Sequence, residues 1–146
     1  MITIHPLSKV HISQLAEIEQ LYFSDPWSPN AFEYELTNPL SVWLVALDGE
    51  LVVGYVGSQT VLDESDIMNV ATRPEYRRNG ISTHLITALI SVLKEKKVRS
   101  LSLEVRKSNE PAILLYTKLG FLQVGLRPNY YRHPKEDAII MRKELC

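Results

Sequence analysis

The chain has 146 residues, 45% of them apolar and 23% charged, an ordinary globular balance that argues for one domain over residues 1–146. Its 16 basic and 17 acidic residues give a net charge of -1, which excludes a nucleic-acid-binding module driven by charge. One cysteine, Cys146, excludes an internal disulfide framework, and four histidines with no second thiol make a metal site unexpected.

No segment of the sequence predicts export or insertion into a membrane. The N-terminus lacks a basic stretch followed by an apolar one, so no secretion signal is expected. The longest uncharged run, Ile81–Leu93, is too short to cross a bilayer. We therefore expect a cytoplasmic protein that binds neither a membrane nor, directly, a nucleic acid.

The first half of the chain predicts two helices followed by an antiparallel meander. Apolar residues recur at helical spacing from Ser8 to Phe23, and Asp25–Trp27 interrupts this helix. Ser28 is a typical N-cap with Pro29 at the first helical position, so a short second helix is expected to follow. The period then changes to that of strands, at 42–47, 51–61 and 66–71, with turns at Asp48-Gly49 and 63–65.

The second half predicts strands and helices in alternation. Helices are expected at 81–96 and 109–119, the latter closed by Gly120, and strands at 101–105, 121–127 and 138–142, with a polar loop between the last two. Together the elements predict an α+β fold. Its mixed, largely antiparallel central sheet, with parallel pairing near the middle, would be flanked by helices.

The segment Arg73–Ser82 lies between a strand and the long helix and is suited to binding an anion. Small or flexible residues there leave backbone N–H groups pointing outward, and the helix dipole adds partial positive charge. The segment is neither a P-loop nor the three-glycine dinucleotide fingerprint. From spacing alone, a phosphate site and an ordinary basic turn are equally supported.

Within this segment, Arg77-x-x-Gly80-x-Ser82 resembles the Gln/Arg-x-x-Gly-x-Gly/Ala signature of the GNAT N-acetyltransferases, which hold the pyrophosphate of acetyl-CoA on this loop. Ser82 stands where that family usually has glycine or alanine, and this small side chain is expected to have a modest effect. The resemblance implies a GNAT-like fold with acetyl-CoA as co-substrate. The pyrophosphate would be wrapped by Arg78, Asn79, Gly80, Ile81, Ser82 and Thr83.

A second segment, Leu103–Phe121, contains a carboxylate, an amide and a phenol that can converge on one cleft. Strand alternation puts Glu104 on the face opposite the apolar positions of its strand. Asn109 and Tyr116 are two helical turns apart, so they share a face of the following helix. The alternative is a surface glutamate, a capping asparagine and a core tyrosine, and spacing by itself favours that alternative.

The same segment, with Pro26-Trp27-Ser28 and the tail motifs Arg127-x-Asn129-Tyr130-Tyr131 and 136–141, resembles the ribosomal-protein-alanine N-acetyltransferases (RimI family) over nearly the entire chain. The resemblance implies direct transfer of an acetyl group from acetyl-CoA to the N-terminal alanine of a ribosomal small-subunit protein. The alternatives are another protein N-terminus or a small-molecule amine. A non-catalytic module that binds coenzyme A is disfavoured, because it would need neither Glu104 nor Tyr116.

This resemblance assigns a role to each candidate residue. Glu104 would be the general base and Tyr116 the general acid, while Asn109 would bind the cofactor beyond its pyrophosphate. For Trp27 a place in the core is an equal alternative to a place in the substrate pocket, and the loop 132–135 lacks a glycine common in the family. The backbone of Val70, Ala71 and Thr72 would face the pantetheine arm and the thioester carbonyl, and the substrate pocket would contain Trp27, Tyr130 and Tyr131.

The chemistry of acetyl transfer explains the choice of these side chains. A peptide α-amine has a pKa of about 7.7–8.0, against about 10.4 for lysine, so a usable fraction of the α-amine is neutral near pH 7. A carboxylate can remove the remaining proton during attack, and backbone N–H groups can stabilise the developing oxyanion. A tyrosine, with a pKa of about 10, retains a proton that it can pass to the departing thiolate. This chemistry requires no metal.

Overall fold

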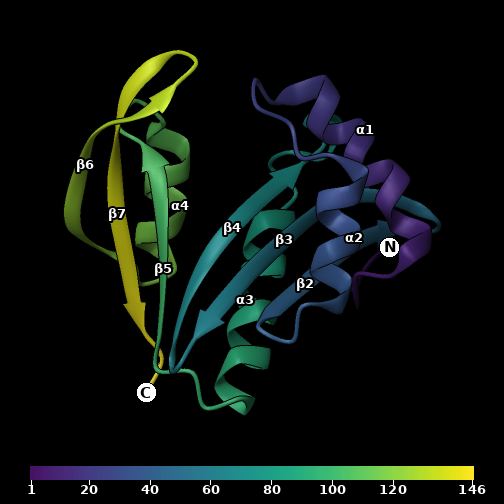
Figure 1. Cartoon of the computed structure of the whole chain (residues 1–146), viewed down its shortest axis with the longest axis horizontal. Helices are drawn as coiled ribbons and strands as arrows, with labels where there is room; N and C mark the ends of the chain where they lie inside the picture. The colour runs from purple at the N-terminus through teal and green to yellow at the C-terminus, as the bar shows by residue number, and fades with distance from the viewer.

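A seven-stranded sheet in the order β1-β2-β3-β4-β5-β7-β6 forms the centre of the molecule in the computed structural model, which describes residues 1–146 (Figure 1). The strands are β1 (Ile2–Pro6), β2 (Ser41–Asp48), β3 (Leu51–Val61), β4 (Glu64–Thr72), β5 (Ser100–Arg106), β6 (Leu122–Arg132) and β7 (Lys135–Glu144). The helices are α1 (Ile12–Tyr22), α2 (Pro29–Thr37), α3 (Ile81–Glu95) and α4 (Glu110–Lys118), with 3-10 turns η1 (Lys9–His11) and η2 (Pro74–Tyr76).

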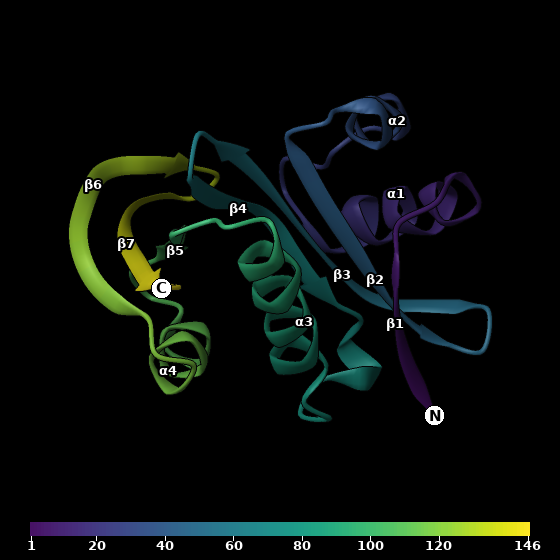
Figure 2. The same cartoon turned by 90° about the horizontal axis from the view of Figure 1, so that it is seen from below.

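The helices cover both faces of this sheet. Figure 2 shows α1 and α2 on one face and α3 and α4 on the other. Alternation along β2 supplies a core to each side: Leu44 packs with the α3 side, whereas Trp43 and Val45 pack with α1 and α2. The predicted α+β class, with a mixed and largely antiparallel sheet, is therefore confirmed.

Most of the expected elements are present, with shifts at their ends. The second helix begins as expected, because the Ser28 hydroxyl accepts the Ala31 N–H at 3.1 Å and Pro29 occupies the first turn. The first helix was expected from Ser8, but the α-helix begins only at Ile12, after the 3-10 turn η1. The edge strand β1 was not expected, because the alternation of Ile2 and Ile4 with Thr3 and His5 is too short to predict a strand by itself.

Three expected turns or loops also differ. The β2–β3 turn lies at Gly49-Glu50, because Asp48 still pairs with Leu51 and Gly49 supplies the positive φ. The next turn lies at Leu62-Asp63, one residue earlier than the start expected for it, since Val61 already pairs with Glu64. The polar loop expected between the last two strands is instead a long hairpin, whose polar residues are exposed on the strands β6 and β7.

Parallel pairing occurs at one place only and is short. β4 pairs with β5 at Glu64–Asp66 against Ser100–Ser102, and every other neighbouring pair of strands is antiparallel. Beyond these three residue pairs the two strands diverge, as the open V of Figure 1 shows. A bulge in the β3–β4 pairing at Gly57/Ser58 bends β4 where the divergence begins. The divergence leaves the remaining edge of β4 without a partner strand.

No helix combines the length and the apolar character that a membrane crossing requires. No group of three or more His, Cys, Asp and Glu side chains is arranged so that it could hold a metal ion.

Candidate active site

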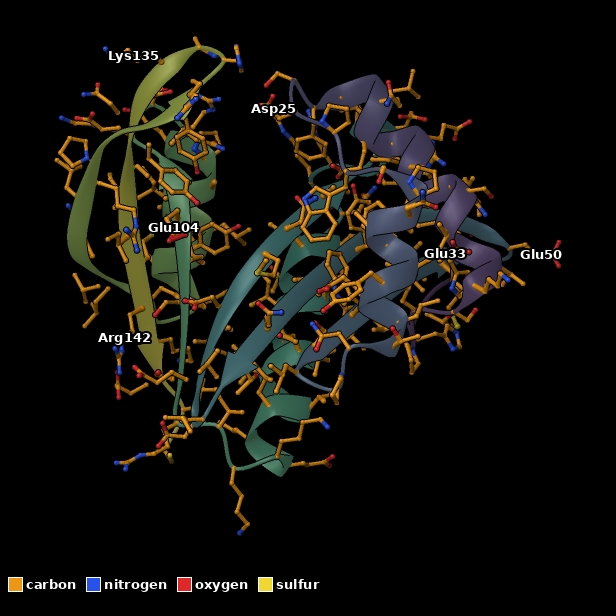
Figure 3. All side chains as sticks on the ribbon, in the orientation of Figure 1. Asp25, Glu33, Glu50, Glu104, Lys135 and Arg142 are labelled. Atoms are coloured by element: carbon orange, nitrogen blue, oxygen red, sulfur yellow. The ribbon has the colours of Figure 1, made fainter.

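A cavity of about 770 Å³ opens where β4 and β5 diverge. Its walls are β4 from Asp66 to Val70 and β5 from Leu103 to Arg106, and Ala112 and Tyr116 of α4, which lies behind β5 in Figure 1, also line it. The loop after α1 and the β6–β7 hairpin border its upper end; in Figure 3, Asp25 and Lys135 mark these two borders. The diverging strands therefore create a deep cavity between β4 and β5.

Six of the predicted site residues line this cavity together. Glu104 comes from β5, and Asn109 and Tyr116 lie at the start and on the second turn of α4. The residues are Val70, Glu104, Asn109, Tyr116, Tyr130 and Tyr131. The fold thus brings together the carboxylate, the amide and the phenol, which are separated along the chain.

The alternative interpretations of two of these residues are also realised. Asn109 caps α4, since its Oδ1 accepts the Ala112 N–H at 3.3 Å. Tyr116 is 6% exposed and packs edge-on against Phe121, at 5.7 Å between ring centroids. Capping still leaves the amide Nδ2 of Asn109 free, and the Tyr116 side chain lies at the boundary of core and cavity.

Trp27 lies outside the cavity. Its ring stacks on Phe32 at 5.3 Å and meets Trp43 edge-on at 5.2 Å, so it is partly buried and packs against the aromatic core beneath α2. Of the two alternatives for this residue, these contacts favour packing against the core.

The open edge of β4 presents backbone groups at alternate residues. The Arg73 N–H donates to the Val53 carbonyl at 2.8 Å, and the antiparallel register then turns the backbone of Ala71 toward β3. The N–H groups of Val70 and Thr72 consequently face the gap. Two of the three backbone positions predicted here are thus available, whereas Ala71 is engaged in the sheet.

The loop from Arg78 to Thr83 lies beside this edge, at the start of α3. Gly80 and Arg78 have φ values of 71° and 68°, and Gly80 is the N-cap of α3. None of the backbone N–H groups from Arg78 to Thr83 donates a hydrogen bond within the chain. The loop therefore presents several free donors at the positive end of a helix, as an anion site requires.

Two further contacts define this loop. Ser82, the departure from the usual signature, has its hydroxyl 3.0 Å from that of Thr72, which ties the start of α3 to the end of β4. Arg73 is buried, donating to the Val52 carbonyl at 2.7 Å and to Glu17 at 3.0 Å, so it is not available to an anion. The exposed arginines Arg77 and Arg78 remain as cationic side chains.

The Glu104 carboxylate has a counter-ion on strand β6. The Arg127 Nε lies 3.4 Å from its Oε1, and the Arg127 guanidinium also lies over the Tyr130 ring, 5.9 Å from its centroid. Burial, followed by the charge of Glu104, raises the pKa of Tyr130. The carboxylate is thus partly exposed but electrostatically paired on the side of β6.

The two other cleft tyrosines hold their protons firmly. Burial, and secondarily Tyr131, raises the pKa of Tyr116 to about 12. Burial is also the main cause that raises the pKa of Tyr131 to about 12. Both phenols are therefore neutral hydrogen-bond donors over the whole physiological range.

The residues that support the cleft are ones that the sequence did not predict. The Arg106 guanidinium donates to the His133 and Pro134 carbonyls at 3.1 and 2.8 Å and to Glu136 at 3.3 Å, which fixes the hairpin tip onto β5. Ser24 donates to the His133 carbonyl at 3.0 Å from the opposite wall. These long-range contacts have no signature in the local sequence.

Known proteins of similar sequence and structure are N-acetyltransferases. The model of the Acetyltransferase (GNAT) family matches residues 12–121. A Bacillus subtilis protein, provisionally named a [ribosomal protein bS18]-alanine N-acetyltransferase, is 42% identical over 131 residues, which cover 89% of this chain and 87% of that protein. The crystal structure of the ribosomal-protein-S18-alanine N-acetyltransferase from Escherichia coli gives a TM-score of 0.90 at 35% identity, covering 99% of this chain and 94% of that one.

The fold is shared more widely still. The crystal structure of Arabidopsis thaliana NAA60 in complex with acetyl-CoA gives a TM-score of 0.90 at 21% identity, covering 99% of this chain and 98% of that one.

The raised pKa of Tyr116 predicts a loss of stability at high pH. Between pH 10 and 12 the unfolded chain releases this proton while the folded chain retains it, so the free energy of unfolding falls as pH rises. Urea unfolding at pH 9 and 11 should show that Tyr116→Phe reduces this fall by on the order of 1 kcal/mol. Tyr34→Phe, on the exposed face of α2, is the matched control; an equal effect of both variants would contradict the assignment.

Proposed function

This chain belongs to the GNAT acetyltransferase family, and we propose that it transfers the acetyl group of acetyl-CoA to the N-terminal α-amine of a protein. We propose the alanine N-terminus of a ribosomal small-subunit protein as the acceptor, by analogy with the activity for which the Escherichia coli and Bacillus subtilis relatives are named. The observation that carries the proposal is the convergence of Glu104 and Tyr116 on one cleft beside the free edge of β4. Residues 1–146 would act as one N-acetyltransferase domain.

The residues present fit acetyl-CoA as the acyl donor. The free N–H groups of 78–83 and the cationic Arg78 suit a pyrophosphate, and the N–H groups of Val70 and Thr72 suit an extended pantetheine arm and the thioester oxygen. The unused Nδ2 of Asn109 supplies a further hydrogen-bond donor to the cleft. We assign Ala71 a spacing role only, since its backbone pairs with β3.

Glu104 is proposed as the general base. Its carboxylate lines the cleft and is reached by solvent, with 23% of the side chain exposed, so it can accept the amine proton directly or through a water. Arg127 forms an ion pair with one carboxylate oxygen of Glu104. An acceptor amine that arrives as an ammonium group would compete with Arg127 for the negative charge of Glu104. The ion pair therefore orients Glu104 before the acceptor enters.

Tyr116 is proposed as the general acid. A phenol with a pKa of about 12 is a weaker acid than a thiol, whose ordinary pKa is about 8.5, so a fully formed thiolate in water would not take its proton. The leaving sulfur, however, departs into the same buried pocket, and burial raises the pKa of a thiol as well. Proton transfer concerted with C–S cleavage is thus consistent with this environment.

The acceptor peptide is proposed to enter between the loop after α1 and the β6–β7 hairpin. Tyr130 is 49% exposed on the hairpin, and Tyr131 lies under the Arg106 guanidinium at 4.2 Å. Both would form the substrate pocket with Tyr22 and Phe23 of the opposite border. Trp27 would contribute only by anchoring that border from the core.

The function is tested by incubating the protein with acetyl-CoA and hexapeptides of different N-termini, followed by mass spectrometry. A peptide beginning with free alanine should gain one acetyl group at its α-amine, because that amine is far more often neutral than lysine at pH 7. The same peptide with a blocked N-terminus and an internal lysine is the control. Preferred acetylation of the lysine, or of small amines such as polyamines, would contradict the proposed acceptor.

The donor site is tested by thermal unfolding with and without acetyl-CoA. The ligand should raise the Tm of the wild-type protein, since it binds only the folded state. Gly80→Asp should abolish this shift by placing a carboxylate beside the phosphates. Gly49→Asp is a matched control, because Gly49 also has positive φ and open space around its Cα; a retained shift in folded Gly80→Asp would argue against the loop.

The catalytic assignments are separated by pH. Glu104→Gln should lower kcat/KM by roughly 10²–10⁴ near pH 7, and the loss should shrink above pH 8, where the amine arrives neutral. Tyr116→Phe should lower kcat without recovery at high pH, because its defect lies in protonating the leaving sulfur. Glu64→Gln, another strand glutamate paired with an arginine, should retain activity.

Two results would contradict these roles. Equal losses in Glu104→Gln and Tyr116→Phe at every pH would mean that both side chains only position substrate. Losses of no more than a few-fold in both would mean that proximity and the N–H donors of β4 supply the catalysis.

A further inference from the structure

A buried carboxylate lies behind β4 and the loop after α1, which together border one side of the cleft. Glu19 of α1 is 1% exposed. It accepts the Trp27 backbone N–H at 2.9 Å, the Asn69 Nδ2 at 2.8 Å and the Tyr55 hydroxyl. These donors come from the loop after α1, from β4 and from β3. A carboxyl group buried to this degree is costly unless its oxygens are hydrogen-bonded, so the three contacts fix its position.

The contact with Glu19 fixes the orientation of Asn69. The carboxylate oxygens act as acceptors, so the amide must present its Nδ2 to Glu19 and cannot be turned over. No group of the chain donates to the Asn69 Oδ1. Asn69 nevertheless lines the cavity, one residue before Val70. The cleft therefore contains a neutral, oriented acceptor next to the backbone edge proposed for the thioester.

We infer that Asn69 positions the acceptor amine, its Oδ1 accepting an N–H of the attacking nitrogen, and that Glu19 is the positioning residue that holds this amide. The inference rests on the proposed function and deepens it. A neutral α-amine has a lone pair and two N–H bonds. The lone pair forms the new N–C bond, one proton leaves to Glu104, and the other N–H is retained in the product.

The retained N–H is the one that Asn69 binds. As the C–S bond breaks, the sulfur takes the proton of Tyr116, so the products are the amide and the free thiol. Asn69 changes protonation at no step and is well suited to hold the nitrogen throughout, because an amide oxygen accepts without competing for the proton. A primary α-amine satisfies Glu104 and Asn69 together, whereas a neutral N-terminal proline has one N–H and satisfies only one of them.

The test compares binding of two peptides to the full-length protein saturated with CoA at pH 9, where the α-amine is neutral. One hexapeptide begins with alanine, and the other begins with a propionyl group and so lacks only the amine. Isothermal titration of the wild-type protein should show about tenfold tighter binding of the amine peptide, the usual contribution of one or two hydrogen bonds. Asn69→Ala should reduce this ratio by at least threefold.

Two further variants separate positioning from general damage. Glu19→Gln keeps the size of the side chain but adds an NH2 group that can donate to the Asn69 Oδ1, so the amide can turn over and the ratio should fall as in Asn69→Ala. Tyr55→Phe removes a different donor from the same carboxylate, so it should lower the Tm and leave the ratio unchanged.

The outcomes distinguish this inference from the function on which it rests. An unchanged ratio in Asn69→Ala, or an equal fall in Tyr55→Phe, would overturn the role of Asn69 even if the wild-type protein acetylates the alanine peptide. Absence of acetylation by the wild-type protein, measured with the same peptide and acetyl-CoA, would instead overturn the proposed function.

Discussion

The short parallel pairing of β4 with β5 is the constraint on which the site depends. Three residue pairs hold the strands together at 64–66, and beyond them the backbone N–H groups of Val70 and Thr72 have no partner strand. Buried backbone donors without partners are costly, so such an edge persists only where water or a ligand reaches it. The same divergence therefore creates the cavity and supplies the oriented N–H groups that line it.

The cleft is bounded at both ends, which keeps its two walls at a defined separation. The parallel pairs close the lower end, and the Ser24 hydroxyl bonded to the His133 carbonyl spans the upper end. Each wall is supported from behind: Arg106 and Glu136 fix the hairpin, and Glu19 fixes the opposite wall through three separate elements. Positioned reacting groups need such support, because small displacements are costly to rate.

The sequence predicts the parts of the site that depend on local pattern. Gly80 at the start of α3, and the two-turn spacing of Asn109 and Tyr116, follow from helix geometry that any such segment obeys. Trp27 and Ala71 show where local pattern is insufficient, since packing under α2 and the register with β3 decide their surroundings. Asn69 has no local signature at all, because its orientation depends on a carboxylate 50 residues away in the chain.

The division of charge in the cleft follows from these placements. Glu104 keeps a counter-ion, Arg127, on the side of β6, whereas Tyr116 lies among apolar neighbours that favour the neutral phenol. The proposed proton acceptor is thus paired with a cation, and the proposed proton donor is a neutral phenol. Burial raises the pKa of Tyr116 to about 12, so this phenol keeps its proton near pH 7, whereas Glu104 is held in place by its ion pair with Arg127 and is reached by solvent.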